Sequence, residues 1–160
     1  MESRKEEAVR LFKEGYNCSQ SVFTAYADLY GIDKETALRL SSSFGAGIGR
    51  MREVCGTVSG MAMIAGMETG AVEGKDAKGK QHNYETVQML AEEFRKRNGT
   101  IICRELLGID KKDMVEAAAL TGVKPQERTG EYYKKRPCVK LVEEAAEILE
   151  KTILKDRFKD

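Results

Sequence analysis

Four cysteines are the residues of this 160-residue chain whose type and placement are best suited to chemistry. They are Cys18, Cys55, Cys103 and Cys138, and no two of them form a Cys-x-x-Cys motif. Their spacing excludes a thioredoxin motif, a zinc ribbon and the covalent attachment of a c-type haem. Thiol–disulfide chemistry between distant cysteines, and metal ligation by several of them, remain open.

Each cysteine is predicted to lie in the first turn of a different helix. In chain order they come shortly after Asn17, a glycine-rich loop, Thr100 and Pro137, and the three single residues favour a helix start. A helix N-terminus has unpaired N–H groups and a partial positive charge, which lower the pKa of a cysteine. Burial as core residues is the alternative. The matching positions favour function, so we predict that the four cysteines are reactive thiols of low pKa with a catalytic role.

The elements that must position these thiols are predicted to be helices. No proline occurs before Pro125, and no stretch shows the alternating pattern of a strand. We therefore expect an all-α, single-domain bundle of about eight helices over residues 1–160. The helix at residues 54–67 is apolar nearly all round and is expected to be the buried central helix. Its Gly56 and Gly60 would allow another backbone to approach closely.

The expected helices follow the apolar stripes and the glycines that end them. They cover about residues 2–14, 17–30, 33–44, 54–67, 83–97, 100–108, 110–122 and 137–155. In the third of these, Ala37, Leu40 and Phe44 are expected to face inward. Residues 70–81 are expected to form a mobile surface loop, and residues 124–136 a basic, turn-rich connection.

A glycine-rich loop, Gly45-Ala46-Gly47-Ile48-Gly49-Arg50, precedes the second cysteine. Such a loop can form a nest of N–H groups that binds an anion, which makes Gly45, Gly47, Gly49 and Arg50 candidate cofactor-binding residues. A lone Gly-x-Gly-x-Gly without a preceding strand is not a dinucleotide fingerprint. A tight turn that aims Cys55 into the core is therefore the favoured interpretation.

The charge balance argues against several classes of partner. The chain has 27 Lys and Arg against 26 Asp and Glu, so it lacks the basic excess of a general nucleic-acid binder. The polar start is not typical of a signal peptide, and the longest apolar run is too short to span a membrane. We expect a cytoplasmic protein without membrane insertion. In a reducing compartment, four cysteines are more typical of thiols, metal ligands or a redox device than of structural disulfides.

The order of these segments resembles that of the C_GCAxxG_C_C family, a group of four-cysteine proteins described as redox-active. The resemblance covers residues 15–149. It rests on Asn17-Cys18-Ser19-Gln20, residues 44–50, Cys55-Gly56-Thr57-Val58-Ser59-Gly60, Cys103-Arg104-Glu105-Leu106 and Cys138. Thr57 replaces the usual alanine of the core motif and puts a hydroxyl beside the site. The same region is similar to the non-haem part of split-Soret cytochromes, which implies an electron-transfer setting and an iron–sulfur cluster.

Three hypotheses follow. The first is a thiol-based oxidoreductase in which two cysteines cycle between thiol and disulfide with an unidentified redox partner. The second is a metal protein in which Cys18, Cys55, Cys103 and Cys138 ligate a 2Fe–2S cluster or zinc. The third is a non-catalytic helical module that forms a homodimer through the apolar helix at residues 54–67. We rank them in this order.

Overall fold

The structure is a computed structural model that describes residues 1–159. Its α-helices are α1 (Lys5–Lys13), α2 (Cys18–Ala27), α3 (Lys34–Ser42), α4 (Gly56–Thr69), α5 (Ala77–Asn98), α6 (Cys103–Leu106), α7 (Met114–Leu120), α8 (Gly130–Lys135) and α9 (Cys138–Lys151). Two short 3-10 helices, η1 (Asp28–Tyr30) and η2 (Ile109–Lys111), complete the order. Within the described range no strand is present, and an isolated bridge joins Val54 to Ile102. The all-α prediction is confirmed.

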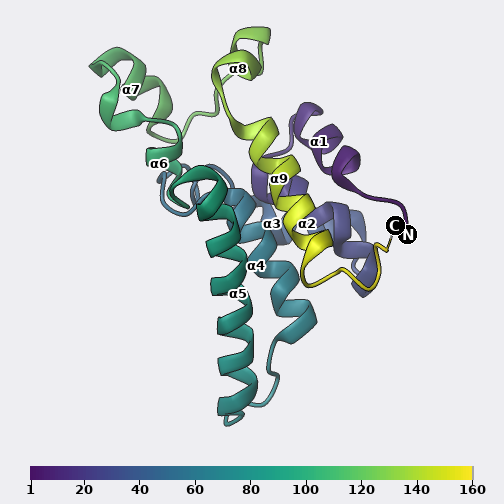
Figure 1. Cartoon of the computed structure of the whole chain (residues 1–160). Helices are drawn as coiled ribbons and strands as arrows, with labels where there is room; N and C mark the ends of the chain where they lie inside the picture. The colour runs from purple at the N-terminus through teal and green to yellow at the C-terminus, as the bar shows by residue number, and fades with distance from the viewer. Residues whose placement is uncertain (160) are drawn as a thin grey trace.

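Helix α2 lies at the centre of the packing and contacts α1, α3, α4 and α9. Helices α4 and α5 form a hairpin that extends to one side, whereas α6, α7 and α8 lie at the opposite end (Figure 1). The two ends of the chain lie together, and the amino group of Met1 donates to the Arg157 carbonyl at 2.9 Å (Figure 1). None of the helices in the described part of the chain is long and apolar enough to cross a membrane.

Side-chain caps explain where most of these helices begin. Asn17 and Gln20 form a reciprocal capping box at the start of α2, with hydrogen bonds of 2.9 and 3.0 Å. Asp33 caps α3 through the Thr36 N–H at 3.0 Å. Both of these starts agree with the sequence prediction.

Two predicted helix starts are wrong because other residues provide the cap, and one helix was not predicted. Asp76 accepts the Gly79 N–H at 2.8 Å, so α5 begins at residue 77 and shortens the predicted loop. Asp113, rather than Asp110, caps α7. Thr129 caps α8, a helix inside the segment expected to be a turn-rich connection.

The predicted inward face of α3 is also partly wrong. Ala37 is buried, but Leu40 is 50% exposed and Phe44 is 39% exposed. Helix α3 packs mainly against α2, so only the narrow stripe of Ala37 and Ser41, one turn apart, faces the core. The Ser41 hydroxyl is satisfied there by donating to the Ala37 carbonyl at 2.7 Å.

The predicted burial of the apolar helix is confirmed in α4, whose Met61 and Ile64 are fully buried. Gly56 and Gly60 allow α2 to pack closely against α4. A Cβ at residue 60 would lie 2.9 Å from the Val22 Cβ, and one at residue 56 would lie 3.0 Å from the Ser19 nitrogen. The backbone that approaches these glycines therefore belongs to the same chain, which removes the feature that motivated a homodimer.

We predict that Gly60→Ala destabilises the protein by about 1–3 kcal/mol, because the added methyl group has no room against α2. Gly66→Ala in the same helix is the matched control, since a Cβ there meets no atom within 4 Å. It should stabilise the fold by about 0.5–1 kcal/mol through helix propensity. Chemical denaturation measures both changes, and equal effects would contradict the close packing of α2 and α4.

Candidate functional site

The four cysteines line one cavity of about 320 Å³. Cys18, Cys103 and Cys138 are the first residues of α2, α6 and α9, and Cys55 is the N-cap residue of α4. The predicted placement at four helix starts is therefore confirmed, and the fold brings these starts together. All four cysteines are free thiols.

Cys18 is held in place by the capped start of α2 and by its close neighbour in α4. The Asn17 side chain, besides capping α2, donates to the Ser42 carbonyl at 2.9 Å. Gly45 leaves the space that this side chain occupies, because a Cβ at residue 45 would lie 2.1 Å from the Asn17 Cγ. A Cβ at Gly56 would lie 3.1 Å from the Cys18 Cβ, so Cys18 packs directly on the start of α4.

Cys55 and Cys103 are joined by a short backbone pairing. The Cys55 N–H donates to the Ile101 carbonyl at 2.8 Å, and the Cys103 N–H donates to the Glu53 carbonyl at 2.6 Å. These bonds flank the bridge between Val54 and Ile102. The pairing fixes the start of α6 against the start of α4, so residues far apart in sequence present their thiols to the same cavity.

The glycine-rich loop has an unusual backbone. Residues 46–50 all have φ between 54 and 71°, the left-handed region, and φ of Arg52 is 61°. A Cβ at Gly47 would lie 2.6 Å from the Arg52 Cα, so this position also lacks space. Such a conformation costs a residue other than glycine about 1 kcal/mol or more. This strain places the Arg50 and Arg52 side chains on the cavity.

Three of the four predicted cofactor-binding residues, Gly45, Gly49 and Arg50, line the cavity, whereas Gly47 does not. The Gly49 N–H already donates to the Ser43 carbonyl at 2.8 Å. This geometry matches the tight turn that leads into Cys55. Cofactor binding by the loop stays a prediction.

Four arginines share the cavity with the thiols, and no aspartate or glutamate lines it. They are Arg50, Arg52, Arg128 and Arg136. Arg50 ends the glycine-rich loop and Arg52 follows it. Arg136 belongs to the basic segment before Cys138, so the sequence places these three near the site. Arg128 comes from the irregular segment before α8 and follows no local motif. Together the four arginines make the cavity strongly electropositive.

The first two arginines are anchored by the C-terminal end of α7. The Arg52 Nε donates to the Leu120 carbonyl at 2.7 Å, and its Nη1 donates to the Cys103 Sγ at 3.6 Å. Arg50 donates to the carbonyls of Thr121 and Gly122 at 2.9 and 3.1 Å. Arg52 is only 3% exposed, so its charge is desolvated beside the thiols.

The other two arginines both lie close to the aromatic ring of Tyr132. The Arg128 and Arg136 Cζ atoms lie 4.8 and 4.7 Å from the centroid of the Tyr132 ring, distances at which a cation–π interaction is favourable. Arg128 also donates to the Phe12 and Tyr16 carbonyls at 2.8 and 3.1 Å. These contacts fasten the segment that precedes α9 onto the end of α1.

Cys138 is the thiol that this environment activates. Hydrogen bonding from the Cys18 thiol is the largest cause that lowers the pKa of Cys138, and the nearby Arg136 and Arg52 lower it further. Burial opposes the shift but does not outweigh it. The same interaction acts in reverse on Cys18, whose pKa is raised well above its ordinary value by Cys138 and by burial. The interaction between these two cysteines therefore favours the thiolate at Cys138 and the thiol at Cys18.

The prediction that all four thiols have a low pKa is wrong for three of them. Burial raises the pKa of Cys55 to about 11 and also raises that of Cys103. Thr57 shares a hydrogen bond of 3.1 Å with the Cys55 sulfur, which offsets only part of the rise in pKa that burial causes. Loss of solvation therefore outweighs the helix N-terminus at these positions.

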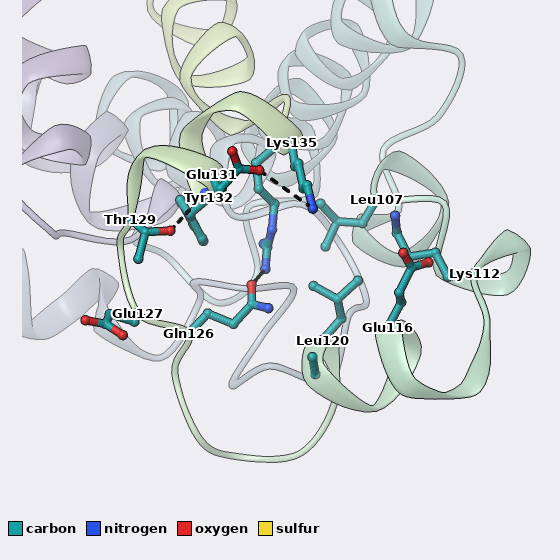
Figure 2. A pocket seen from close by; sticks show the side chains of 12 residues that line it. Leu107, Lys112, Glu116, Leu120, Gln126, Glu127, Thr129, Glu131, Tyr132 and Lys135 are labelled. Atoms are coloured by element: carbon teal, nitrogen blue, oxygen red, sulfur yellow. Dashed lines mark hydrogen bonds and ion pairs between the residues drawn. The ribbon is translucent and has the colours of Figure 1, made fainter.

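A second cavity of about 430 Å³ lies beside the first. Figure 2 shows Gln126, Thr129 and Tyr132 on one side of it and Leu120 and Glu116 on the other. No cysteine lines it, but the two cavities share Leu107, Gln126, Tyr132 and Arg136. The Arg136 guanidinium donates to the Gln126 side chain in this shared wall.

The four cysteines line the same cavity from four helix starts. Over residues 1–159, no three His, Cys, Asp or Glu side chains are grouped so that they could hold a metal ion. Ligation of a 2Fe–2S cluster or of zinc by the four cysteines stays a prediction.

The fold and the site define an all-helical protein with four cysteines around one cavity. A sequence profile described as "Putative redox-active protein (C_GCAxxG_C_C)" matches residues 16–152, and the chain belongs to this family. Neither the curated proteins nor the solved structures contain a significant match.

We predict that Cys138 is the first thiol to react with iodoacetamide at neutral pH. Because its pKa is lowered, its labelling rate should reach a plateau at a lower pH than that of a free cysteine, whose pKa is about 8.5. Cys18→Ala removes the main hydrogen-bond donor and should move the inflection to higher pH. Mass spectrometry of digested protein measures each site.

Cys55→Ala is the matched control for this experiment. Cys55 is buried and neutral at this pH, so its removal should leave the inflection of Cys138 nearly unchanged. An unchanged inflection in Cys18→Ala, or a faster reaction of Cys55 than of Cys138 in the wild type, would contradict the lowering of the Cys138 pKa by Cys18.

Proposed function

We propose that this protein is a thiol–disulfide oxidoreductase in which Cys138 is the nucleophile and Cys18 the resolving thiol. The observation that carries the proposal is that Cys18 and Cys138, both free thiols, begin α2 and α9 and line one cavity together with Arg52 and Arg136. Their interaction lowers the pKa of Cys138 and raises that of Cys18, which supports Cys138 as the nucleophile. Thiol–disulfide exchange needs this combination of a thiolate to attack and a thiol in reach to complete the reaction.

The first step is attack by the Cys138 thiolate on a disulfide substrate. One new S–S bond forms between Cys138 and a substrate sulfur, while the substrate S–S bond breaks and its second sulfur leaves as a thiolate. Arg52 and Arg136, which already favour the Cys138 thiolate, are placed to favour the leaving thiolate as well. The leaving sulfur takes a proton from solvent.

The second step uses Cys18. Once the Cys138 sulfur carries no negative charge, Cys18 loses its proton to solvent and attacks that sulfur. The Cys18–Cys138 disulfide forms and the second half of the substrate leaves as a thiol. Overall, one substrate disulfide is reduced by two electrons and the protein dithiol is oxidised by two electrons.

Cys55 and Cys103 have a different part in this scheme. Both are buried, their pKa values are raised, and both are engaged by hydrogen bonds to Thr57 and Arg52. They stay protonated at neutral pH and take no part in the first step. We further propose a reducing compartment, the cytoplasm, in which a pair of free thiols can act as the electron donor.

We predict that mild oxidation with diamide produces one disulfide, between Cys18 and Cys138. Digestion under non-reducing conditions followed by mass spectrometry identifies the pair. In Cys18→Ala, a disulfide substrate should instead remain trapped on Cys138 as a mixed disulfide, because the resolving thiol is missing.

The double variant Cys55→Ser with Cys103→Ser is the control, and it should keep the oxidisable pair. A disulfide that joins Cys55 to Cys103 in the wild type, or four thiols that resist diamide, would refute the proposed function. Elemental analysis of anaerobically purified protein tests the metal alternative. Iron or zinc bound by the four cysteines would refute the thiol–disulfide proposal.

A further inference from the structure

The four arginines of the cysteine cavity carry positive charge that no carboxylate neutralises. Within residues 1–159, every ion pair within 4.0 Å involves other residues, and the cavity lining holds no acidic side chain. The other arginines of the described chain all form ion pairs, for example Arg97 with Glu147 and Arg157 with Glu68. Among the arginines, the lack of an acidic partner is therefore confined to this cavity.

The hydrogen bonds of these arginines leave donors free. Arg52 uses its Nε and Nη1 atoms on a carbonyl and on the Cys103 sulfur, so both protons of Nη2 have no acceptor among the hydrogen bonds of the described chain. Arg136 is held by the Gln126 amide oxygen and by the Tyr132 ring, both of which are neutral. A charge that is 97% buried, as in Arg52, is costly without an anion nearby.

The guanidinium groups also repel one another. The pKa of Arg50 is lowered by burial first and then by the charges of Arg52 and Arg136. One thiolate at Cys138 offsets only part of four positive charges. A bound anion would relieve the repulsion and take up the free donors, and guanidinium groups match the geometry of carboxylates.

The size of the cavity favours an organic anion over a small inorganic one. Small-molecule sites typically measure about 300–1,000 Å³. The cysteine cavity, with about 320 Å³, lies within this range. A molecule with an extended chain can place its charged end among the arginines while its sulfur atoms reach Cys138.

We propose that this cavity binds a low-molecular-weight disulfide with carboxylate groups, which the four arginines recognise and the Cys138 sulfur reduces. The reduction rests on the proposed function, whereas the binding of the carboxylates does not. One substrate S–S bond breaks, the Cys18–Cys138 bond forms, and two carboxylate-bearing thiols leave. The substrate disulfide is the oxidant and the protein dithiol is the reductant.

Binding is tested without redox chemistry in the Cys138→Ala variant. Suberate, the carbon analogue of the dicarboxylate dithiodipropionate, is the probe, and the uncharged octanediol is its matched control. Calorimetry should show binding of suberate and none of octanediol, with affinity falling at high salt. Arg50→Gln and Arg136→Gln should each lower the affinity for suberate at least about tenfold. Arg39 is exposed on α3, so Arg39→Gln should leave this affinity unchanged.

Reduction is tested with three disulfides of similar size and different charge on the wild-type dithiol protein. Single-turnover rates should fall in the order dithiodipropionate, hydroxyethyl disulfide and cystamine, which carry negative, zero and positive charge. Arg50→Gln should reduce this preference at least about tenfold. Circular dichroism confirms that the variants are folded.

The two experiments separate the two proposals. Suberate binding without reduction of any disulfide would refute the redox function and leave the anion site standing. Equal rates for the three disulfides, with no suberate binding, would overturn the anion site and leave the redox function standing. Tighter binding of inorganic phosphate than of suberate would overturn the assignment to an organic disulfide.

Discussion

The close approach of α2 and α4 at Gly56 is the constraint on which the site depends. A Cβ at this position would lie 3.0 Å from the Ser19 nitrogen and 3.1 Å from the Cys18 Cβ, so any side chain would press the two helix starts apart. This contact brings Cys18 and Cys55 to one cavity. The backbone pairing at Ile102 adds Cys103, and α9, which packs on both α2 and α4, adds Cys138. Tertiary packing therefore assembles the thiols.

The same cavity gives chemically identical side chains different properties. Burial raises the pKa of Cys55 and Cys103, whereas a thiol donor and two guanidinium groups lower that of Cys138 despite its burial. The difference in pKa depends on whether a group that stabilises the thiolate contacts the sulfur. A helix start alone does not offset the loss of solvation that burial causes. One reactive thiolate and three protonated, less reactive thiols can therefore line the same cavity.

The sequence predicted most of the helices, the family and the four thiols because these leave local signals. Asn17 and Asp33 are recognisable caps, and the apolar run of α4 has no alternative to burial. Arg128 left no such signal, because it lies in an irregular segment and reaches α1 only in the folded chain. The pKa values were mispredicted for a similar reason, since burial depends on packing that no local pattern reveals.

The left-handed backbone at residues 46–50 lowers the stability of the fold but positions side chains of the candidate site. Ile48 is β-branched, and a φ of 64° is strongly unfavourable for such a residue. A sequence optimised only for folding would place glycine or asparagine there. The strained run is also what orients Arg50 and Arg52, so relaxing it would loosen the charges beside the thiols. Efforts to raise the thermal stability of this protein should therefore leave residues 46–50 unchanged. Substitutions that relieve the strain would raise stability but would loosen the positions of Arg50 and Arg52.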